Sequence, residues 1–360
     1  MPSWSARDLA KLDALKARLA ASESERAAQA ERIAILSAAA RDDRDASRTR
    51  ARELAHRVPS EEALKHVLPL RAAALRSAAC EAPVWREPPS PTAPPEWPAD
   101  RVEIGGLTFF VPQDAGVPGK LSARILGGWL PLREIAATRD VAVGAVMIDI
   151  GANVGTTVVP RVALGDFGWA YALEADPANA ESLRRAVEVN GFGRRISVDH
   201  MALADHDGTI RLARSTQIGT HHIVLGAETT SGTIEVPCRR LDTWVREREV
   251  NVFLVTFIKC DVEGAELAVL LGAPEVLAHK HIAWQVEFSP ATLISQHTAP
   301  VDLLALATDR FDYFIDLQGD GSRARCRPTA ELKEAVAYVG TAERAAYTNL
   351  VLFNGPPRPD

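Results

Sequence analysis

Apolar and polar positions follow two different patterns between about residue 101 and residue 353. Short apolar runs, typical of buried strands, are separated by stretches whose apolar residues recur every three or four positions, as they do in amphipathic helices. Strand and helix signals that alternate in this order predict crossover units. We therefore expect an α/β fold with a mostly parallel sheet and helices on both faces.

The same pattern predicts the individual elements. Strands are expected at residues 146–150, 169–174, 196–200, 209–212, 253–260, 282–288, 313–317 and 350–353, and helices after Gly155 and at residues 177–189, 264–271 and 301–308. Upstream, VEIGGLTFFV predicts a hairpin that turns at Gly105-Gly106, and residues 121–137 should be helical around a break at Gly127-Gly128. Parallel sheets of this kind bind ligands beyond the carboxyl ends of their strands.

The first part of the chain follows a different pattern. Residues 5–56 contain no Gly or Pro and are rich in Ala, Arg, Glu and Asp, which favour helix. A leucine stripe begins at Leu9, but the same heptad frame reaches Ser22, Arg26 and Gln29, so a partly solvated helix is favoured over a dimerising coiled coil. PVWREPPSPTAPPEWP then predicts an extended linker. The expected organisation is a partly coiled-coil-like helical arm at 1–82, a Pro-rich linker at 83–100 and the α/β domain at 101–357.

Composition narrows the class of protein. The formal net charge is −6, which argues against a dedicated nucleic-acid binder. The four cysteines form no Cys-x-x-Cys pair, so neither a disulfide framework nor a zinc site is expected. The N-terminus has no apolar core of a secretion signal, and no apolar run is long enough for a membrane span. These features predict a cytoplasmic protein.

The loop after the first strand of the predicted sheet carries the first candidate chemistry. VMIDIGANVG places Asp149, Gly151, Asn153 and Gly155 directly behind a buried strand. Such a turn either is merely tight or holds a nucleoside-bearing ligand; a dinucleotide loop reads Gly-x-Gly-x-x-Gly. Here Asp149 replaces the first glycine, and a carboxylate would repel a pyrophosphate but attract a sulfonium or ammonium group. The loop therefore predicts S-adenosyl-L-methionine binding by these four residues.

Acidic residues also follow the next two strands. Glu174, at the end of the second strand, lies where a carboxylate can accept hydrogen bonds from both hydroxyls of a ribose. Asp205, after the third strand, could accept one from the amino group of an adenine. Three acids behind three successive strands are expected to form one cofactor site.

A second constellation is FIKCDVEGAELAVLLGA. A buried strand ends in Lys259, Asp261 and Glu263 before a helix begins, which places these charges at the mouth of the same crevice. Asp261 could contact the cofactor, orient the substrate or receive the proton of an attacking hydroxyl, and Glu263 is a candidate substrate contact. For Glu263 and Glu266 the alternative is that they only favour a helix N-terminus.

The sequence resembles the FkbM family of S-adenosylmethionine-dependent methyltransferases. The resemblance rests on six stretches between about Val146 and Pro290, in the family's order: VMIDIGANVGTTVVPRVAL, AYALEADPANAESLRRAVEVNG, MALADHDGTIRL, VPCRRLDTWV, FIKCDVEGAELAVLLGA and WQVEFSP. It implies a Rossmann-like class I methyltransferase fold and the methylation of a hydroxyl on a sugar or natural product. It also implies that Asp149, Gly151, Asn153 and Gly155 line the methionine side of the cofactor and Glu174 the ribose.

Methyl transfer from a neutral hydroxyl needs a proton acceptor. The candidate catalytic residues are Asp261, His222, Glu287 and Lys259, and His221 and Glu263 are candidate substrate contacts, although a histidine pair on a loop is more often solvated. No metal is expected, because no His/Asp spacing requires one. The expected partner is a small-molecule or glycan acceptor, not a nucleic acid, and the N-terminal helices could form a homodimer. The alternatives are an NAD-dependent oxidoreductase and a non-catalytic scaffold that senses a cofactor.

Overall fold

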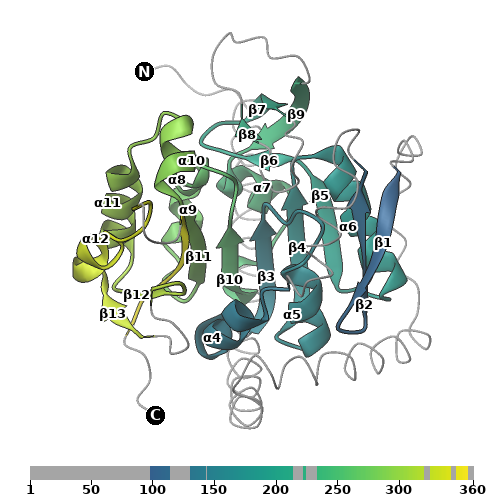
Figure 1. The fold of residues 1–360 in the computed structure, drawn as a ribbon, viewed down its shortest axis with the longest axis horizontal. Helices are drawn as coiled ribbons and strands as arrows, with labels where there is room; N and C mark the ends of the chain where they lie inside the picture. The colour runs from purple at the N-terminus through teal and green to yellow at the C-terminus, as the bar shows by residue number, and fades with distance from the viewer. Residues whose placement is uncertain are drawn as a thin grey trace, which may run out of the picture. The chain divides into compact units, whose positions relative to one another are not determined.

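An eight-stranded sheet runs through the centre of the chain (Figure 1). The structure, a computed structural model, describes residues 98–113, 130–142, 144–213, 222–223, 233–319, 325–341 and 346–355. All of these residues lie within one compact unit that spans residues 50–360. The predicted N-terminal arm, most of the linker and the expected break at Gly127-Gly128 lie outside the described residues.

The middle of the sheet is parallel, as predicted. Its parallel strands are β3 (Gly144–Ile150), β4 (Phe167–Glu174), β5 (Ile196–His200), β10 (Val255–Cys260) and β11 (Ala283–Phe288), in the spatial order β11-β10-β3-β4-β5. Numbered along the chain this is 5-4-1-2-3, the order of a Rossmann-like sheet, with its switch point between β3 and β10. Beyond β11 lie β14 (Thr348–Phe353), β12 (Tyr313–Asp316) and β13 (Arg327–Pro328), and β14 is antiparallel to both β11 and β12.

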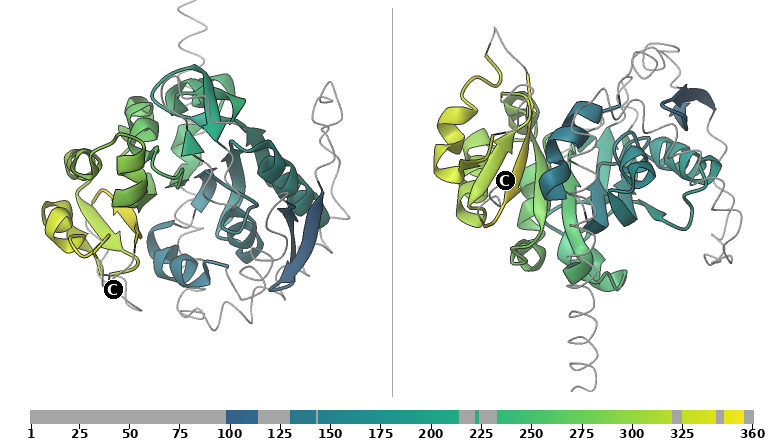
Figure 2. Two further views of the ribbon diagram at one scale, coloured as in Figure 1. Left: turned by 45° about the horizontal axis from the view of Figure 1, so that its top comes forward. Right: turned by 90° about the horizontal axis from the view of Figure 1, so that it is seen from below.

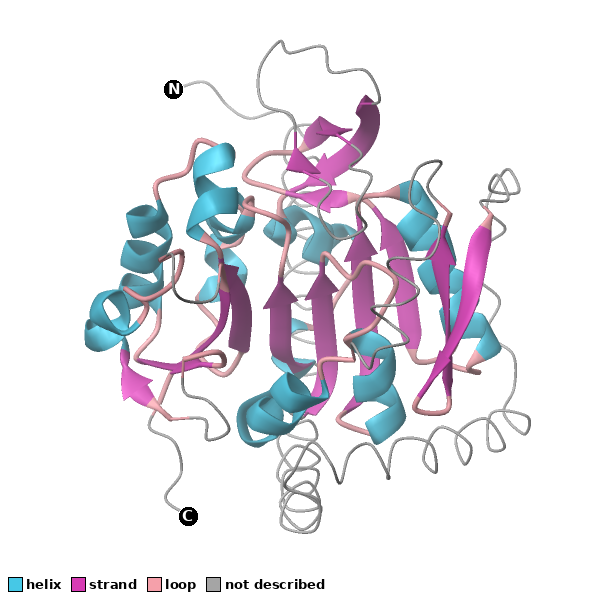
Figure 3. Ribbon diagram, in the orientation of Figure 1, coloured by secondary structure: helices cyan, strands magenta, loops and turns pink. Residues whose placement is uncertain are grey.

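Helices cover both faces of the sheet, as Figures 2 and 3 show. One face of β3, with Ile148 and Ile150, packs in the same core as α7 (Leu241–Glu247), α8 (Glu266–Leu271), α9 (Pro274–Leu277) and α11 (Pro300–Arg310). The opposite face, with Met147, packs in a second core with α4 (Leu132–Ala142), α5 (Val158–Leu164) and α6 (Pro177–Val189). The remaining short helices are α10 (Pro290–Ser295) and α12 (Leu332–Ala335), with 3-10 turns at Val252–Leu254 and Thr329–Glu331.

Two smaller sheets accompany the central one. The hairpin of β1 (Ala99–Ile104) and β2 (Leu107–Pro112) turns at Gly105-Gly106, as predicted. A four-stranded sheet of β6 (Ala202–Leu203), β7 (Gly208–Ala213), β8 (His222–Ile223) and β9 (Thr233–Arg239) lies beyond the carboxyl ends of β3, β4 and β10 (Figure 1). Of this sheet, the sequence pattern predicted only β7. Within the described ranges, no helix is both long and apolar enough to cross a bilayer.

Candidate active site

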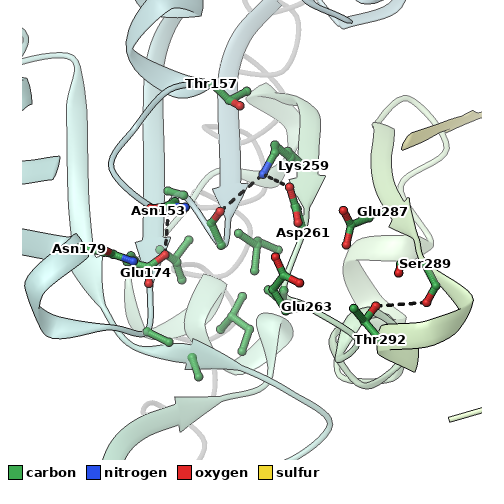
Figure 4. A pocket seen from close by; sticks show the side chains of 18 of the residues that line it. Asn153, Thr157, Glu174, Asn179, Lys259, Asp261, Glu263, Glu287, Ser289 and Thr292 are labelled. Atoms are coloured by element: carbon green, nitrogen blue, oxygen red, sulfur yellow. Dashed lines mark hydrogen bonds and ion pairs between the residues drawn. The ribbon is translucent and has the colours of Figure 1, made fainter. Parts of the chain in front are cut away.

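A pocket with a volume of about 470 Å³ opens at the carboxyl ends of β3, β4, β10 and β11 (Figure 4). This is the switch point of the sheet, where the loops after β3 and β10 lead to opposite faces. The four-stranded sheet contributes apolar side chains from β6 and β7, and the start of α10 contributes Ser289 and Thr292. The described charged residues of the lining are five carboxylates and one ammonium: Glu134, Glu174, Asp261, Glu263, Glu287 and Lys259.

The loop after β3 has the tight geometry that its glycines predict. Gly151 has φ +74°, and a Cβ there would lie 1.8 Å from the carbonyl oxygen of Asp261, so the loops after β3 and β10 touch. Asn153 has φ 52°, and its backbone N–H donates to Glu174 Oε2 over 2.8 Å. Gly155 does not line the pocket. A Cβ at Gly155 would meet Leu183 of α6 at 2.4 Å, so this glycine allows close helix packing.

Glu174 is fixed at the end of β4 with its carboxyl group in the pocket (Figure 4). Its two oxygens accept the backbone N–H groups of Asn153 and Asp176, each over 2.8 Å. Only 7% of Glu174 is exposed, and burial raises its pKa to about 7 despite these two hydrogen bonds. A ligand that donates hydrogen bonds here would stabilise the charged carboxylate.

Asp149 does not line the pocket. It is fully buried, because successive residues of a strand face opposite sides and Asp149 shares the side of Met147, which is covered by α4, α5 and α6. Burial raises the pKa of Asp149, and the nearby ammonium of Lys259 opposes this shift. The structure therefore does not place Asp149 where it could contact a ligand in this pocket, contrary to the expectation. Asp149 pairs with Lys259 instead.

Lys259 links Asp149 to the pocket. Its Nζ lies 3.5 Å from Asp149 Oδ1 and 3.1 Å from Asp261 Oδ2, and its side chain is 8% exposed. Burial alone would lower the pKa of Lys259, but the two carboxylates raise it above its ordinary value. Lys259 is therefore a permanent cation between two strands.

Three further carboxylates meet on the β10–β11 side of the pocket. Carboxylate oxygens of Asp261, Glu263 and Glu287 all lie within 4.8 Å of one another. Burial, followed by repulsion from Asp261, raises the pKa of Glu263 to about 8 and that of Glu287 to about 10. Glu266 instead accepts the N–H groups of Val262 and Gly264 and shapes the turn, as the helix-start interpretation predicts.

Sequence reasoning missed Glu134. This residue of α4 lines the pocket and accepts hydrogen bonds from Gln285 Nε2 at 3.1 Å and Asn349 Nδ2 at 3.2 Å. Burial raises its pKa. No local motif marks Glu134, because its partners come from β11 and β14. Asn179, also missed, had a signal: it lies in the first turn of the helix that follows Glu174.

The other predicted site residues lie elsewhere. Asp205 is more than half exposed, contacts Nδ1 of its neighbour His206 at 2.8 Å and does not line the pocket. His222 begins β8 opposite Ala213, but its side chain is outside the described part of the chain, as is all of His221. The structure therefore brings together Gly151, Asn153, Glu174 and the Lys259–Asp261–Glu263–Glu287 group.

Comparisons with known proteins agree with the motifs. Residues 149–310 match the family model described as the Methyltransferase FkbM domain, which confirms the resemblance seen in the sequence. No curated protein matches the chain.

Several solved structures are similar at low identity. A methyltransferase FkbM from Methylobacillus flagellatus KT is 19% identical, with 59% of this chain and 44% of that chain covered and a TM-score of 0.34. The 16S rRNA methyltransferase RsmC of T. thermophilus, in complex with AdoMet and guanosine, is 17% identical, with coverage of 74% and 52% and a TM-score of 0.34. TYW2 of M. jannaschii, in complex with AdoMet, is 9% identical, with coverage of 71% and 84% and a TM-score of 0.30. The chain thus spans less than half of the length of the first of these proteins.

Proposed function

We propose that this chain, which contains an FkbM methyltransferase domain, transfers a methyl group from S-adenosyl-L-methionine to a hydroxyl of a sugar or another natural product. The observation that carries the proposal is the acidic lining of the pocket at the switch point. Five acidic side chains and one ammonium are the ionisable groups among its described lining residues. Burial raises the pKa values of Glu174, Glu263 and Glu287, and a donor that carries a sulfonium and an ammonium group would lower these values and stabilise the carboxylate forms, whereas a pyrophosphate would not.

The β3–β4 side of the pocket fits the adenosyl part of the donor. Glu174 presents carboxylate oxygens toward the pocket and can accept hydrogen bonds from two ribose hydroxyls. The apolar side chains of Leu203, Ile210 and Leu212 lie in the same lining and suit a purine ring. Gly151 and Asn153 bring the loop backbone close to the donor's methionine end. These contacts support an adenosyl ligand, and the preference for this donor over NAD rests on the acidic lining, which disfavours a pyrophosphate.

The β10–β11 side fits the acceptor. Asp261, Glu263 and Glu287 lie there, close to the position that the donor's methyl group would face. In the transfer, the acceptor oxygen forms a bond to the methyl carbon while the carbon–sulfur bond breaks and the sulfur keeps the electron pair. The hydroxyl proton leaves to one of these carboxylates or to water. Holding oxygen, methyl carbon and sulfur in line is the main contribution of the protein.

The same acidic lining favours a neutral acceptor. Phosphate groups of a nucleic acid would approach several acidic side chains, and Lys259, the cation of the described lining, already contacts Asp149 and Asp261. A neutral hydroxyl meets no such repulsion. This supports a sugar or natural-product acceptor over RNA or DNA.

The test begins with calorimetry of the full-length chain against S-adenosyl-L-methionine and against NAD. We expect the first to bind and the second not to. The chain is then incubated with the donor and panels of hydroxyl, amine and RNA acceptors, and S-adenosylhomocysteine and methylated products are identified by mass spectrometry. The proposal would be contradicted if the chain bound NAD but not S-adenosyl-L-methionine, or if the product were methylated on nitrogen. Donor binding with no turnover on any acceptor would favour the scaffold alternative.

A further inference from the structure

Three acidic side chains converge on one point at the acceptor end of the pocket. Asp261 and Glu263 follow β10, and Glu287 lies on β11, the neighbouring parallel strand. Each offers a carboxylate oxygen within 4.8 Å of the other two. Two oxygens bound to the same Mg²⁺ or Ca²⁺ ion are at most about 4 to 5 Å apart, so this spacing suits a shared ion.

Glu287 supplies an independent observation. Only 9% of the residue is exposed, and within the described residues no donor forms a hydrogen bond or an ion pair with its carboxyl group. Figure 4 shows that the carboxyl group of Glu287 faces the pocket, on the side of Asp261 and Glu263. Its carboxyl oxygens stay accessible from the pocket, so a ligand that binds there can coordinate them without displacing a protein partner.

Acidic groups outnumber cations around this cluster. Lys259 is the described cation of the lining, and it already bridges Asp149 and Asp261. Glu263 and Glu287 are left without an opposite charge in contact. The backbone at Glu263, with φ 55°, adopts a conformation that non-glycine residues rarely adopt, and this conformation is part of the turn that places its side chain.

We propose that Asp261, Glu263 and Glu287 bind one hard divalent cation, such as Mg²⁺ or Mn²⁺. Oxygen ligands alone, with neither histidine nor cysteine, select this class of ion. The spacing along the chain gave no sign of this site, because Glu287 comes from a different strand than the other two ligands. The inference therefore replaces the sequence-based expectation that no metal is bound.

The role of the cation rests on the proposed function. Three carboxylates leave coordination positions open on a six-coordinate ion, and the acceptor can fill two of them with neighbouring oxygens. A bound cation would lower the pKa of the acceptor hydroxyl, so that its proton would pass to water and its oxygen could attack the methyl group. The favoured acceptor class is then a vicinal diol or an α-hydroxy carbonyl compound.

The binding of the cation can be tested without donor or acceptor. The metal-free full-length chain is titrated with Mn²⁺, and free Mn²⁺ is followed by electron paramagnetic resonance. We expect one tight site per chain, competed by Mg²⁺. The variants Glu287→Gln and Glu263→Gln should weaken Mn²⁺ binding at least about tenfold. The control variant Glu334→Gln, an exposed acid on α12, should bind like the unmodified chain.

Absence of a tight site, or equal Mn²⁺ binding by all three variants, would overturn the inference. Circular dichroism checks that each variant is folded. The two proposals can fail separately. If the chain binds Mn²⁺ but methylates no acceptor, the cation site is supported and the proposed function is contradicted. If the chain binds no Mn²⁺ and methyl transfer survives EDTA treatment, the proposed function is supported and the cation site is contradicted.

Discussion

Glu174 shows how a single side chain can report on cofactor binding. Two backbone N–H groups hold its carboxyl group in place, yet burial keeps its pKa near 7. At neutral pH the group is therefore close to half protonated. Ribose hydroxyls donate hydrogen bonds most favourably to the ionised form, so the donor and a proton compete for Glu174.

The affinity for S-adenosyl-L-methionine should therefore depend on pH. We expect the affinity to be constant well above about pH 7. Below that pH it should decrease, with a slope that approaches about tenfold per pH unit, because the protonated acid must first ionise. The Glu174→Gln variant should bind at least about tenfold more weakly and lose this dependence. Calorimetry between about pH 5.5 and about pH 8.5 measures both effects. An unchanged pH profile in the variant would remove Glu174 from the cofactor site.

Asp205 provides the matched comparison. Sequence reasoning assigned it to the adenine, but in the structure it is exposed, paired with His206 and absent from the pocket lining. We expect Asp205→Asn to change donor affinity by less than about twofold. Calorimetry alongside Glu174→Gln decides the point, and a large loss of affinity in Asp205→Asn would show that this loop closes over the ligand.

The difference between Asp149 and Glu174 shows why the sequence alone could not predict which acidic side chains face the pocket. Both acids end a parallel strand, and both were predicted to touch the cofactor. Strand residues alternate between the two faces of the sheet. The residue at which each strand ends therefore decides whether its acid lies at the carboxyl edge of the sheet, next to the pocket. β3 continues to Ile150, so Asp149 points into a helical layer, whereas Glu174 is the last residue of β4 and faces the pocket.

At the scale of elements, β3 and β10 are joined by an ion pair as well as by their hydrogen bonds. Lys259 lies opposite Asp149 in the register, and both side chains are almost entirely buried. Removing one partner of such a pair leaves an uncompensated charge in a region of low polarity, and removing both does not.

The Lys259→Met variant should therefore lose about 3 to 5 kcal/mol in its free energy of unfolding. Combining it with Asp149→Asn should restore most of that loss, because no buried charge remains on β3. Urea unfolding of the two single variants and the double variant provides a double-mutant cycle. Additive losses would mean that the two residues do not act as a pair.

The contact between the loops after β3 and β10 gives a second test. Gly151→Ala introduces a Cβ that would lie 1.8 Å from the Asp261 carbonyl oxygen, at a φ of +74°. We expect a loss of at least about 2 kcal/mol, from left-handed strain together with displacement of the loop. Gly193→Ala is the control, because nothing lies within 4 Å of a Cβ there, and it should change stability by less than about 1 kcal/mol. Equal unfolding midpoints for the two variants would refute this interpretation.

At the scale of the whole molecule, buried acids make stability depend on pH. Burial raises the pKa values of Glu174 and Glu266 to about 7 from an ordinary value of 4.5. Between these values the folded chain binds more protons than the unfolded chain, so the free energy of unfolding falls as pH rises.

Urea unfolding should accordingly show the higher stability near pH 5 and a decline as pH rises, to which Glu174 and Glu266 contribute up to about 3 kcal/mol each by about pH 7. Glu263 and Glu287, whose pKa values are raised to about 8 and about 10, extend the decline to higher pH. Glu266→Gln should reduce the slope, although it also removes acceptors for the Val262 and Gly264 N–H groups. Stability that rises across this window would contradict the assignment of these acids as buried and protonated.

The sequence predicted the large-scale plan better than the site. The alternation of strands and helices gave the parallel sheet, because periodicity reflects which face of each element is buried. It missed β9 and α7, which lie between the third strand and β10. It could not find Glu134, whose role depends on side chains from two distant strands, Gln285 and Asn349. Residues joined only by tertiary structure leave no local pattern.

The position of β14 has a consequence for how the protein is made. This strand, close to the end of the chain, is inserted between β11 and β12, and its Asn349 holds Glu134 from α4. Until residues 348–353 have been synthesised, β12 has no partner that joins it to β11, and Asn349 is missing from the lining of the cavity. The complete lining, with Glu134 held by Asn349, therefore forms only when β14 pairs between β11 and β12.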